Sequence, residues 1–277
     1  MRVARAGNQF MPTQQETRAV SDIDAQKARA LADMLEDFDV RVRTALRQQP
    51  SDRRWRRIFE TAAARVDRAK LRALQAFIRD DSDRLMGMPA FKYLDIPFYL
   101  LNKARWVAEL DLDRRPPERI LDLGVGAGHF PFLAAAYGHQ VVGIDMDNDV
   151  YARLLELYGI PRLVQMIVPP AALPDCGRFD LITSLQTTFN RPVGRGRVGR
   201  TGVYWTLAEW AWFFEQLCAR LSYPGRIFFE LNQQPWPDTG ADHAQELMDL
   251  FARNGATVDR RRFTVLFQLG MPLTLDT

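Results

Sequence analysis

Apolar residues in the first part of the chain recur at steps of three and four positions, the spacing that places them on one face of a helix. One such stripe runs from Asp22 to about Arg47, and a second runs from Ser51, which suits a helix N-cap, to Ile78. We therefore expect two long amphipathic helices, packed as an antiparallel hairpin within an N-terminal helical region of residues 1–88. About 15 residues at the start are expected to be disordered.

From residue 119 onward, short apolar runs of strand length alternate with amphipathic helical segments. A helix from Pro97 to about Leu110 precedes them. Later helices are expected at 128–137, 148–157, 206–221 and 241–254, and strands at 119–123, 140–144, 163–168, 179–184, 226–231, 257–259 and 263–268. This alternation predicts an α/β domain over residues 89–277, with a seven-stranded, mostly parallel sheet and helices on both faces.

The composition, 47% hydrophobic and 26% charged, is that of an ordinary globular protein. No apolar run approaches the roughly 18 residues of a membrane span, and no apolar stretch of a secretory signal follows the arginines near Met1. We therefore expect a cytoplasmic protein with no membrane span, whose start is either Met1 or Met11. Cys176 and Cys218 are expected to be free thiols, and no Cys or His spacing indicates a metal site.

The net charge of +3 is spread unevenly along the chain. Residues 1–80 hold 17 Lys and Arg against 11 Asp and Glu, a balance of +6, so the remainder carries −3. This asymmetry fits either a solvated helical surface or an anionic partner such as nucleic acid. The apolar residues that the hairpin leaves uncovered would pack on the sheet domain or on a second copy in a homodimer.

A strand, a glycine turn and a helix start follow one another from Ile120 to Phe130. Glycines at 124, 126 and 128 let the backbone turn sharply and approach a ligand without Cβ atoms in between. Asp145 ends the next strand, where a carboxylate can accept hydrogen bonds from both ribose hydroxyls. Because ligands of open parallel sheets bind at the carboxyl ends of the strands, this pairing predicts a nucleoside cofactor.

Two residues of the turn distinguish between nucleoside cofactors. A dinucleotide fingerprint would place its third glycine at position 129, which is a histidine here. Asp122, just before the turn, would repel a pyrophosphate but suits a ligand with a cationic amino group. The turn therefore favours S-adenosylmethionine over a dinucleotide.

The stretch from Arg119 to Gln268 resembles the class I S-adenosylmethionine-dependent methyltransferases, a Rossmann-like family. The resemblance is carried by LDLGVGAG at 121–128, GID at 143–145, FDLI at 179–182 and PGRIFF at 224–229. It implies S-adenosylmethionine as the cofactor. It places the methionine portion on Asp122, Gly124, Val125, Gly126 and Gly128, the ribose on Asp145, the adenine against Met146, and the methyl group near the stretch from Leu185 and Gln186 to Asn190. We also expect Tyr93, in the N-terminal cap, to reach the cofactor.

One departure from the family pattern concerns the adenine. Many members carry an acidic residue near the end of the third strand, where residues 167–170 read Ile-Val-Pro-Pro in this chain. Adenine recognition is therefore expected to depend on main-chain groups and on apolar packing around Met146, Ile167 and Val168.

Methyl transfer from a sulfonium is an in-line displacement, so a base helps only where the acceptor is protonated, as a hydroxyl is. The candidates for such chemistry are Glu230 and Asn232, at the end of the fifth strand, and His129. We expect His139 in a turn away from the site and His243 on a solvent-facing helix surface. The fourth strand is not followed by an Asn-Pro-Pro-Tyr or Asp-Pro-Pro-Tyr motif, which argues against a nucleobase or amide nitrogen as the acceptor.

A glycine- and arginine-rich stretch at 191–202 follows the fourth strand and is expected to lie over the acceptor. Its Arg195, Arg197 and Arg200 suit an anionic substrate or nucleic-acid phosphates equally. Tyr204 and Trp205 come next and are candidates to stack on a sugar or a planar acceptor.

The sequence thus predicts a methyltransferase that uses S-adenosylmethionine and acts on oxygen of a small-molecule, sugar or lipid-linked acceptor. Two alternatives stay open. One is an RNA or protein methyltransferase that docks through the basic helices and the Arg/Gly loop. The other is a non-catalytic protein that binds S-adenosylmethionine and serves in assembly.

Overall fold

The computed structural model describes residues 25, 27–48, 52–191, 203–232 and 243–277. Its centre is one seven-stranded sheet with the strand order β3-β2-β1-β4-β7-β9-β8. The bounds are β1 Arg119–Leu123, β2 Gln140–Asp145, β3 Arg162–Val164, β4 Phe179–Leu185, β7 Leu221–Glu230, β8 Thr257–Asp259 and β9 Thr264–Leu269. The first five strands in this order are parallel, and β9 runs antiparallel to both neighbours. The predicted fold class is confirmed.

The chain order reverses at β1, which has β2 on one side and β4 on the other. Asp122 of β1 is in register with Gly143 of β2 and with Thr183 of β4. The carboxyl ends of these three strands therefore meet at one edge of the sheet, which is where ligands bind in such sheets. The third strand is shorter than predicted, since it ends at Val164, and residues 165–168 continue as a loop along the same edge.

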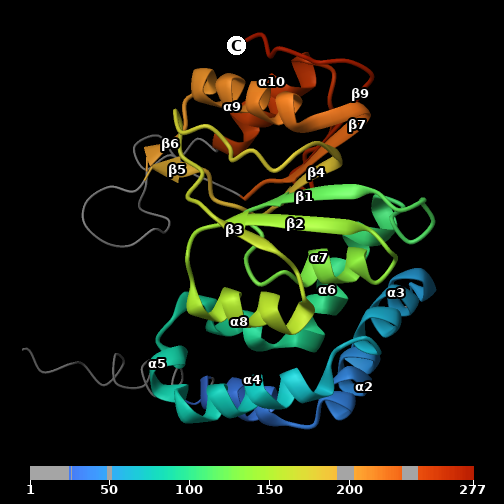
Figure 1. Cartoon of the computed structure of the whole chain (residues 1–277), viewed down its shortest axis with the longest axis vertical. Helices are drawn as coiled ribbons and strands as arrows, with labels where there is room; N and C mark the ends of the chain where they lie inside the picture. Colours follow the sequence, from blue (N-terminus) through green and yellow to red (C-terminus); the bar gives the residue numbers. More distant parts are fainter. Residues whose placement is uncertain (1–24, 26, 49–51, 192–202, 233–242) are drawn as a thin grey trace, which may run out of the picture.

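Helices cover both faces of the sheet, and the hydrophobic core is accordingly divided into two clusters. Figure 1 shows α9 and α10 on one face, α6, α7 and α8 on the other, and α2 to α5 in a further layer outside these. The bounds are α6 Ile96–Glu109, α7 His129–Ala135, α8 Asp149–Tyr158, α9 Leu207–Arg220 and α10 His243–Arg253. No helix in the described part of the chain is long and apolar enough to span a membrane.

The prediction of two long N-terminal helices is wrong, because each is divided by an aspartate that caps a new helix. Asp37 accepts hydrogen bonds from the backbone N–H of Asp39 and of Val40, so the first stripe breaks before α2. Asp67 caps α4 in the same way and separates it from α3. The resulting elements are a helical segment at 27–35, α2 Phe38–Gln48, α3 Arg53–Ala63, α4 Arg68–Asp80 and α5 Ser82–Met86, followed by the 3₁₀ helix η1 Pro89–Leu94. The apolar periodicity continues across both breaks, so the sequence pattern alone predicts one helix where the structure has two.

These short helices are fixed to the sheet domain by packing and by ion pairs. α3 packs on α6, and Arg54 of α3 holds Asp113, just before β1, with two hydrogen bonds of 2.5 and 3.0 Å. Arg41 of α2 pairs with Asp95 at 2.8 Å, and Asp95 in turn caps α6. The N-terminal layer therefore holds η1 and α6 in place at the edge of the sheet.

Candidate active site

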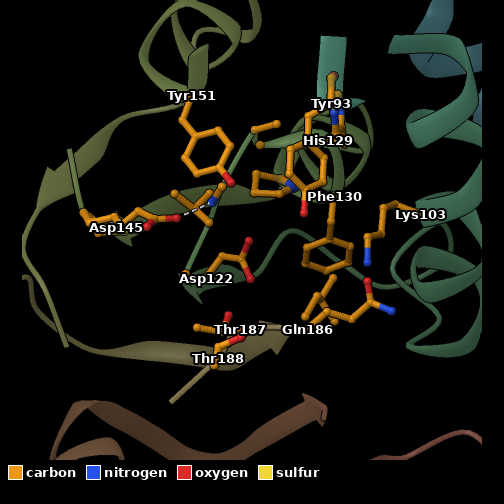
Figure 2. Close-up of a pocket in the computed structure, with 18 of the residues that line it drawn as sticks. Tyr93, Lys103, Asp122, His129, Phe130, Asp145, Tyr151, Gln186, Thr187 and Thr188 are labelled. Atoms are coloured by element: carbon orange, nitrogen blue, oxygen red, sulfur yellow. Dashed lines mark hydrogen bonds between the residues drawn. The ribbon is translucent and has the colours of Figure 1, made fainter. Parts of the chain in front are cut away.

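A cavity of about 480 Å³ opens at the carboxyl ends of β1, β2 and β4, within the roughly 300–1,000 Å³ usual for small-molecule sites. Figure 2 shows Asp122 on its floor, Asp145 and Tyr151 towards one end, and Lys103 and Phe130 towards the other. The lining residues come from five places: η1 and α6, the glycine turn and start of α7, the end of β2 and the start of α8, the loop after β3, and the loop after β4.

The glycine turn forms the floor of the cavity, and its backbone conformation requires glycine. Gly124 has φ +66° and Gly126 has φ +52°, in the left-handed region that side chains disfavour. A Cβ on Gly124 would also overlap the side chain of Thr187 from the loop after β4. The turn thus brings bare backbone to the ligand, and Thr187 fixes it from below by donating a hydrogen bond of 2.8 Å to the carbonyl of Leu123.

Asp145 stands at the end of β2 and is tied to the glycine turn. One carboxylate oxygen accepts the Gly126 N–H at 2.5 Å, and the other accepts the Met146 N–H at 2.7 Å. Burial raises the pKa of this carboxyl, and these two N–H donors counter the effect. Each oxygen keeps a further lone pair, so the carboxylate can still accept both hydroxyls of a ribose.

Asp122 is the second acid of the cavity and is almost fully buried, with 3% of its surface exposed. The Thr183 hydroxyl of β4 donates to it at 2.6 Å. Burial raises the pKa of Asp122 to about 7, against the opposing effects of this hydrogen bond and of the Lys103 charge. Lys103 offsets only part of the cost of a buried negative charge on Asp122, and a cationic ligand group would offset the rest.

Glu230, a candidate base from the sequence, ends β7 beside the cavity but does not line it. Its carboxylate accepts hydrogen bonds from Arg105 at 2.6 Å, Trp106 Nε1 at 2.9 Å, Gln186 at 3.1 Å and Lys103 at 3.2 Å. These four hydrogen bonds hold the carboxylate outside the cavity lining, so Glu230 is not placed to contact an acceptor. Glu230 therefore anchors α6 to the end of β7.

His129 lines the cavity, but both of its ring nitrogens are already engaged. Nε2 lies 3.1 Å from the Tyr93 carbonyl, which can only accept, so Nε2 carries the proton. Nδ1 therefore accepts from the Tyr158 hydroxyl at 2.8 Å. Burial lowers the pKa of His129 to about 3, so the ring is neutral at physiological pH. His129 acts as a link between η1 and the start of α7 rather than as a base.

Aromatic and apolar side chains make up the upper wall of the cavity. The rings of Tyr93 and Tyr99 are 4.9 Å apart, those of Tyr93 and Tyr151 are 5.8 Å apart, and Tyr99 stacks on His129. Burial raises the pKa of Tyr99 to about 12, so its hydroxyl stays protonated. The Asp145 end is lined by Tyr151, Met146, Gln165, Met166 and Ile167. This end is suited to a flat heterocycle.

Most residues predicted for the cofactor line this one cavity: Tyr93, Asp122, Gly124, Val125, Gly126, Gly128, Asp145, Met146, Ile167, Leu185 and Gln186. Val168 does not line it. Asn232 also lies outside the lining and donates at 2.5 Å to the Gln186 carbonyl, so it supports the loop after β4. Arg195, Arg197 and Arg200 lie outside the described residues.

Three aromatic or histidine predictions need correction. Trp205 is fully buried against Phe189 and Trp210 and cannot stack on an acceptor. His243, expected on a solvent-facing surface, is buried and stacks on the Tyr204 ring at 5.3 Å, so Tyr204 meets α10 rather than the cavity. His139 lies away from the cavity, as predicted, although it is buried there with both nitrogens bonded to backbone.

Sequence reasoning missed a row on α6. Phe98, Tyr99, Asn102 and Lys103 follow the spacing i, i+1, i+4, i+5 and all line the cavity. The same one-sided spacing is present in the sequence, but nothing in it distinguishes a cavity-facing row from a solvent-facing one. Gln165 and Met166, in the loop that follows β3, were also missed.

Part of the chain is similar to a known protein family. Residues 121–192 match the family model described as a methyltransferase domain. No protein of curated function matches the sequence. Similar solved structures include DesVI of Streptomyces venezuelae (14% identity, covering 52% of this chain and 54% of that one, TM-score 0.37), SAM-bound CalS10, an amino pentose methyltransferase of Micromonospora echinaspora (18%, 56% and 56%, 0.36), and the glycopeptide N-methyltransferase MtfA (12%, 63% and 90%, 0.41).

This chain spans 54% of the length of DesVI. The family match is more direct, since it begins within β1 and continues past the loop after β4. It therefore includes the glycine turn, Asp145 and the residues beneath the cavity. Residues 121–192 are thus similar to a methyltransferase domain family, and they lie within a seven-stranded, Rossmann-like sheet.

Proposed function

We propose that this protein transfers the methyl group of S-adenosylmethionine to an oxygen of a small-molecule, sugar or lipid-linked acceptor. The observation that carries the proposal is the junction of Asp145 with the glycine turn, where a carboxylate at the end of β2 and bare backbone face one cavity. The cofactor fits the residues present. Asp145 takes its ribose, Met146 and Ile167 flank its adenine, and Asp122 meets its ammonium group.

The cofactor supplies an activated methyl group on a sulfonium, and the protein has to align an acceptor with it and keep water out. The aromatic wall of Tyr93, Tyr99 and Tyr151 serves the exclusion of water. The loop after β4, with Thr187 and Thr188, closes the cavity on the opposite side (Figure 2). Thr187 also donates a hydrogen bond to the Leu123 carbonyl, just before the glycine turn, which fixes the position of the loop relative to the cavity floor.

The charges of the cavity favour an uncharged acceptor group over an ammonium group. Among the described lining residues, the two carboxylates are Asp122 and Asp145, and both are assigned to the cofactor. The remaining charged groups, Lys92 and Lys103, are cationic, so no carboxylate of the described lining is left to pair with a protonated amine. A hydroxyl carries no such charge, which supports methylation on oxygen.

A screen with methyl-labelled S-adenosylmethionine tests the proposal. Fractionated cell extract is incubated with the wild-type protein and with Asp145→Ala, and the label is followed into small molecules, lipids, RNA and protein. We expect label in a small-molecule or lipid fraction with the wild type alone, in a linkage stable to mild base as an ether is. Label in RNA or protein would contradict the proposed acceptor class.

A further inference from the structure

Lys103 is the one cation of the described cavity lining that is largely buried. It lies on α6 in the row that faces the cavity, and 15% of its side chain is exposed. Lys92, the other lysine of the lining, is exposed at the edge. Figure 2 shows Lys103 beside Phe130 and Gln186, across the cavity floor from Asp122.

Glu230 holds Lys103 in place but does not use up its charge. Arg105 donates to Glu230 at 2.6 Å and Lys103 at 3.2 Å, so Arg105 makes the closer contact with this carboxylate. Two cations and one anion leave a surplus of one positive charge, and Lys103 is the member of the group that lines the cavity. Within the described residues, Glu230 is the single hydrogen-bond partner of the Lys103 ammonium, which has three N–H groups.

An ammonium group that is mostly removed from water needs partners for its remaining N–H groups. Burial lowers the pKa of Lys103, because the charged ammonium group has lost most of its hydration. A ligand oxyanion in the cavity would supply both the missing acceptor and the missing negative charge. The position of Lys103 restricts which part of the ligand this is, because Lys103 lies at the end of the cavity away from Asp145 (Figure 2) and its charge interacts with that of Asp122.

Asp122 lacks a positively charged hydrogen-bond partner, since it is buried and its side chain accepts a hydrogen bond from the neutral Thr183 hydroxyl. The four charged groups at this end, Asp122, Lys103, Glu230 and Arg105, sum to zero. A ligand group that carries one positive and one negative charge at the same time satisfies both Asp122 and Lys103 and leaves the sum unchanged. An α-amino acid group is such a zwitterion, whereas a single charge would satisfy one residue and oppose the other.

We propose that Lys103 binds the α-carboxylate of the amino-acid portion of S-adenosylmethionine while Asp122 binds its α-ammonium. This assignment rests on the proposed function, since it takes S-adenosylmethionine as the ligand. Glu230 then acts as a positioning residue, because it holds the lysine on the cavity side of α6. Arg105 takes the larger share of the Glu230 charge and so leaves the lysine available.

The test is a cycle of two proteins and two ligands, measured by titration calorimetry. The ligands are S-adenosylmethionine and decarboxylated S-adenosylmethionine, which keeps the nucleoside, sulfonium and ammonium but lacks the carboxylate. The proteins are the wild type and Lys103→Met. We expect the substitution to weaken S-adenosylmethionine about 10- to 100-fold, the worth of a charge-assisted hydrogen bond, and to change the affinity of the decarboxylated ligand less than about twofold.

Equal losses for both ligands would overturn the proposal, because they would indicate general damage to the cavity. No loss for either ligand would overturn it as well and would direct the search to an acceptor carboxylate. If neither ligand binds the wild type, the proposed function itself fails. Lys70→Met, on the outer helix α4, removes the same charge away from the cavity and serves as the matched control.

Discussion

Replacement of Asp122 by asparagine should stabilise the ligand-free protein, by an amount that grows as the pH rises from about 4 to about 7. The carboxyl is buried on the cavity floor, where burial raises its pKa to about 7 from an ordinary value of 3.8. A raised pKa means that the folded protein holds this proton more tightly than the unfolded chain does. The contribution of Asp122 to stability is therefore greatest below pH 4, falls as the pH rises towards 7, and is constant above that.

The size of the effect follows from the pKa difference of about three units. At 1.36 kcal/mol per unit, the charged carboxylate costs the folded state about 4 kcal/mol at pH 8 relative to its protonated form. An asparagine side chain has nearly the same shape and can still accept the Thr183 hydroxyl hydrogen bond, which is 2.6 Å long in the parent protein. The variant thus removes the charge while it preserves the local geometry.

Urea unfolding of the ligand-free parent and of Asp122→Asn, at pH 4.5 and pH 8, measures this difference. We expect a gain of about 1 kcal/mol for the variant at pH 4.5 and of up to about 4 kcal/mol at pH 8. A difference that is the same at both pH values would refute the reasoning. The same variant should bind S-adenosylmethionine more weakly, so stability and cofactor binding would change in opposite directions.

Three further predictions concern residues around the site. Gly124→Ala should weaken S-adenosylmethionine binding at least about 10-fold in calorimetry, because its Cβ overlaps Thr187 at φ +66°, whereas Gly270→Ala, with open space around it, should bind normally. His129→Phe should lower the free energy of unfolding by about 1–3 kcal/mol at pH 8, and by about 2 kcal/mol less at pH 5, because at pH 5 the ring takes up a proton in the unfolded chain but not in the folded protein; the same loss at both pH values would show that burial does not lower the pKa of the ring. Trp205→Ala should lower the free energy of unfolding, measured in urea, by about 3–5 kcal/mol, because the side chain is fully buried. A smaller decrease together with weaker acceptor binding would indicate that Trp205 contacts the acceptor after all.

The parts of the fold that were predicted correctly depend on local sequence signals. The strand, glycine turn and helix start around Gly124 require unusual residues within a few positions, and Asp145 follows one strand later. The capping threonine of α9, Thr206, is of the same kind: its side chain and that of Glu209 form a capping box at the predicted helix start. Such features can be predicted because the residues that interact are also close together in the sequence.

The parts that were not predicted depend on contacts between distant segments. Lys103 reads as an ordinary helix lysine until α6 is packed beside β7, where Glu230 lies 127 positions away in sequence. The burial of Trp205 and His243 likewise results from the packing of α9 and α10 on the sheet. The breaks at Asp37 and Asp67 have a local cause, but the apolar stripe continues through both.

The most direct test of the account is a calorimetric titration of the wild-type protein and of Asp145→Ala with S-adenosylmethionine. The account predicts one-to-one binding by the wild type and a loss of at least about 10-fold for Asp145→Ala, because the variant lacks the acceptor for both ribose hydroxyls and the anchor for the Gly126 N–H. Absence of binding by the wild type, or equal affinities of the two proteins, would contradict it.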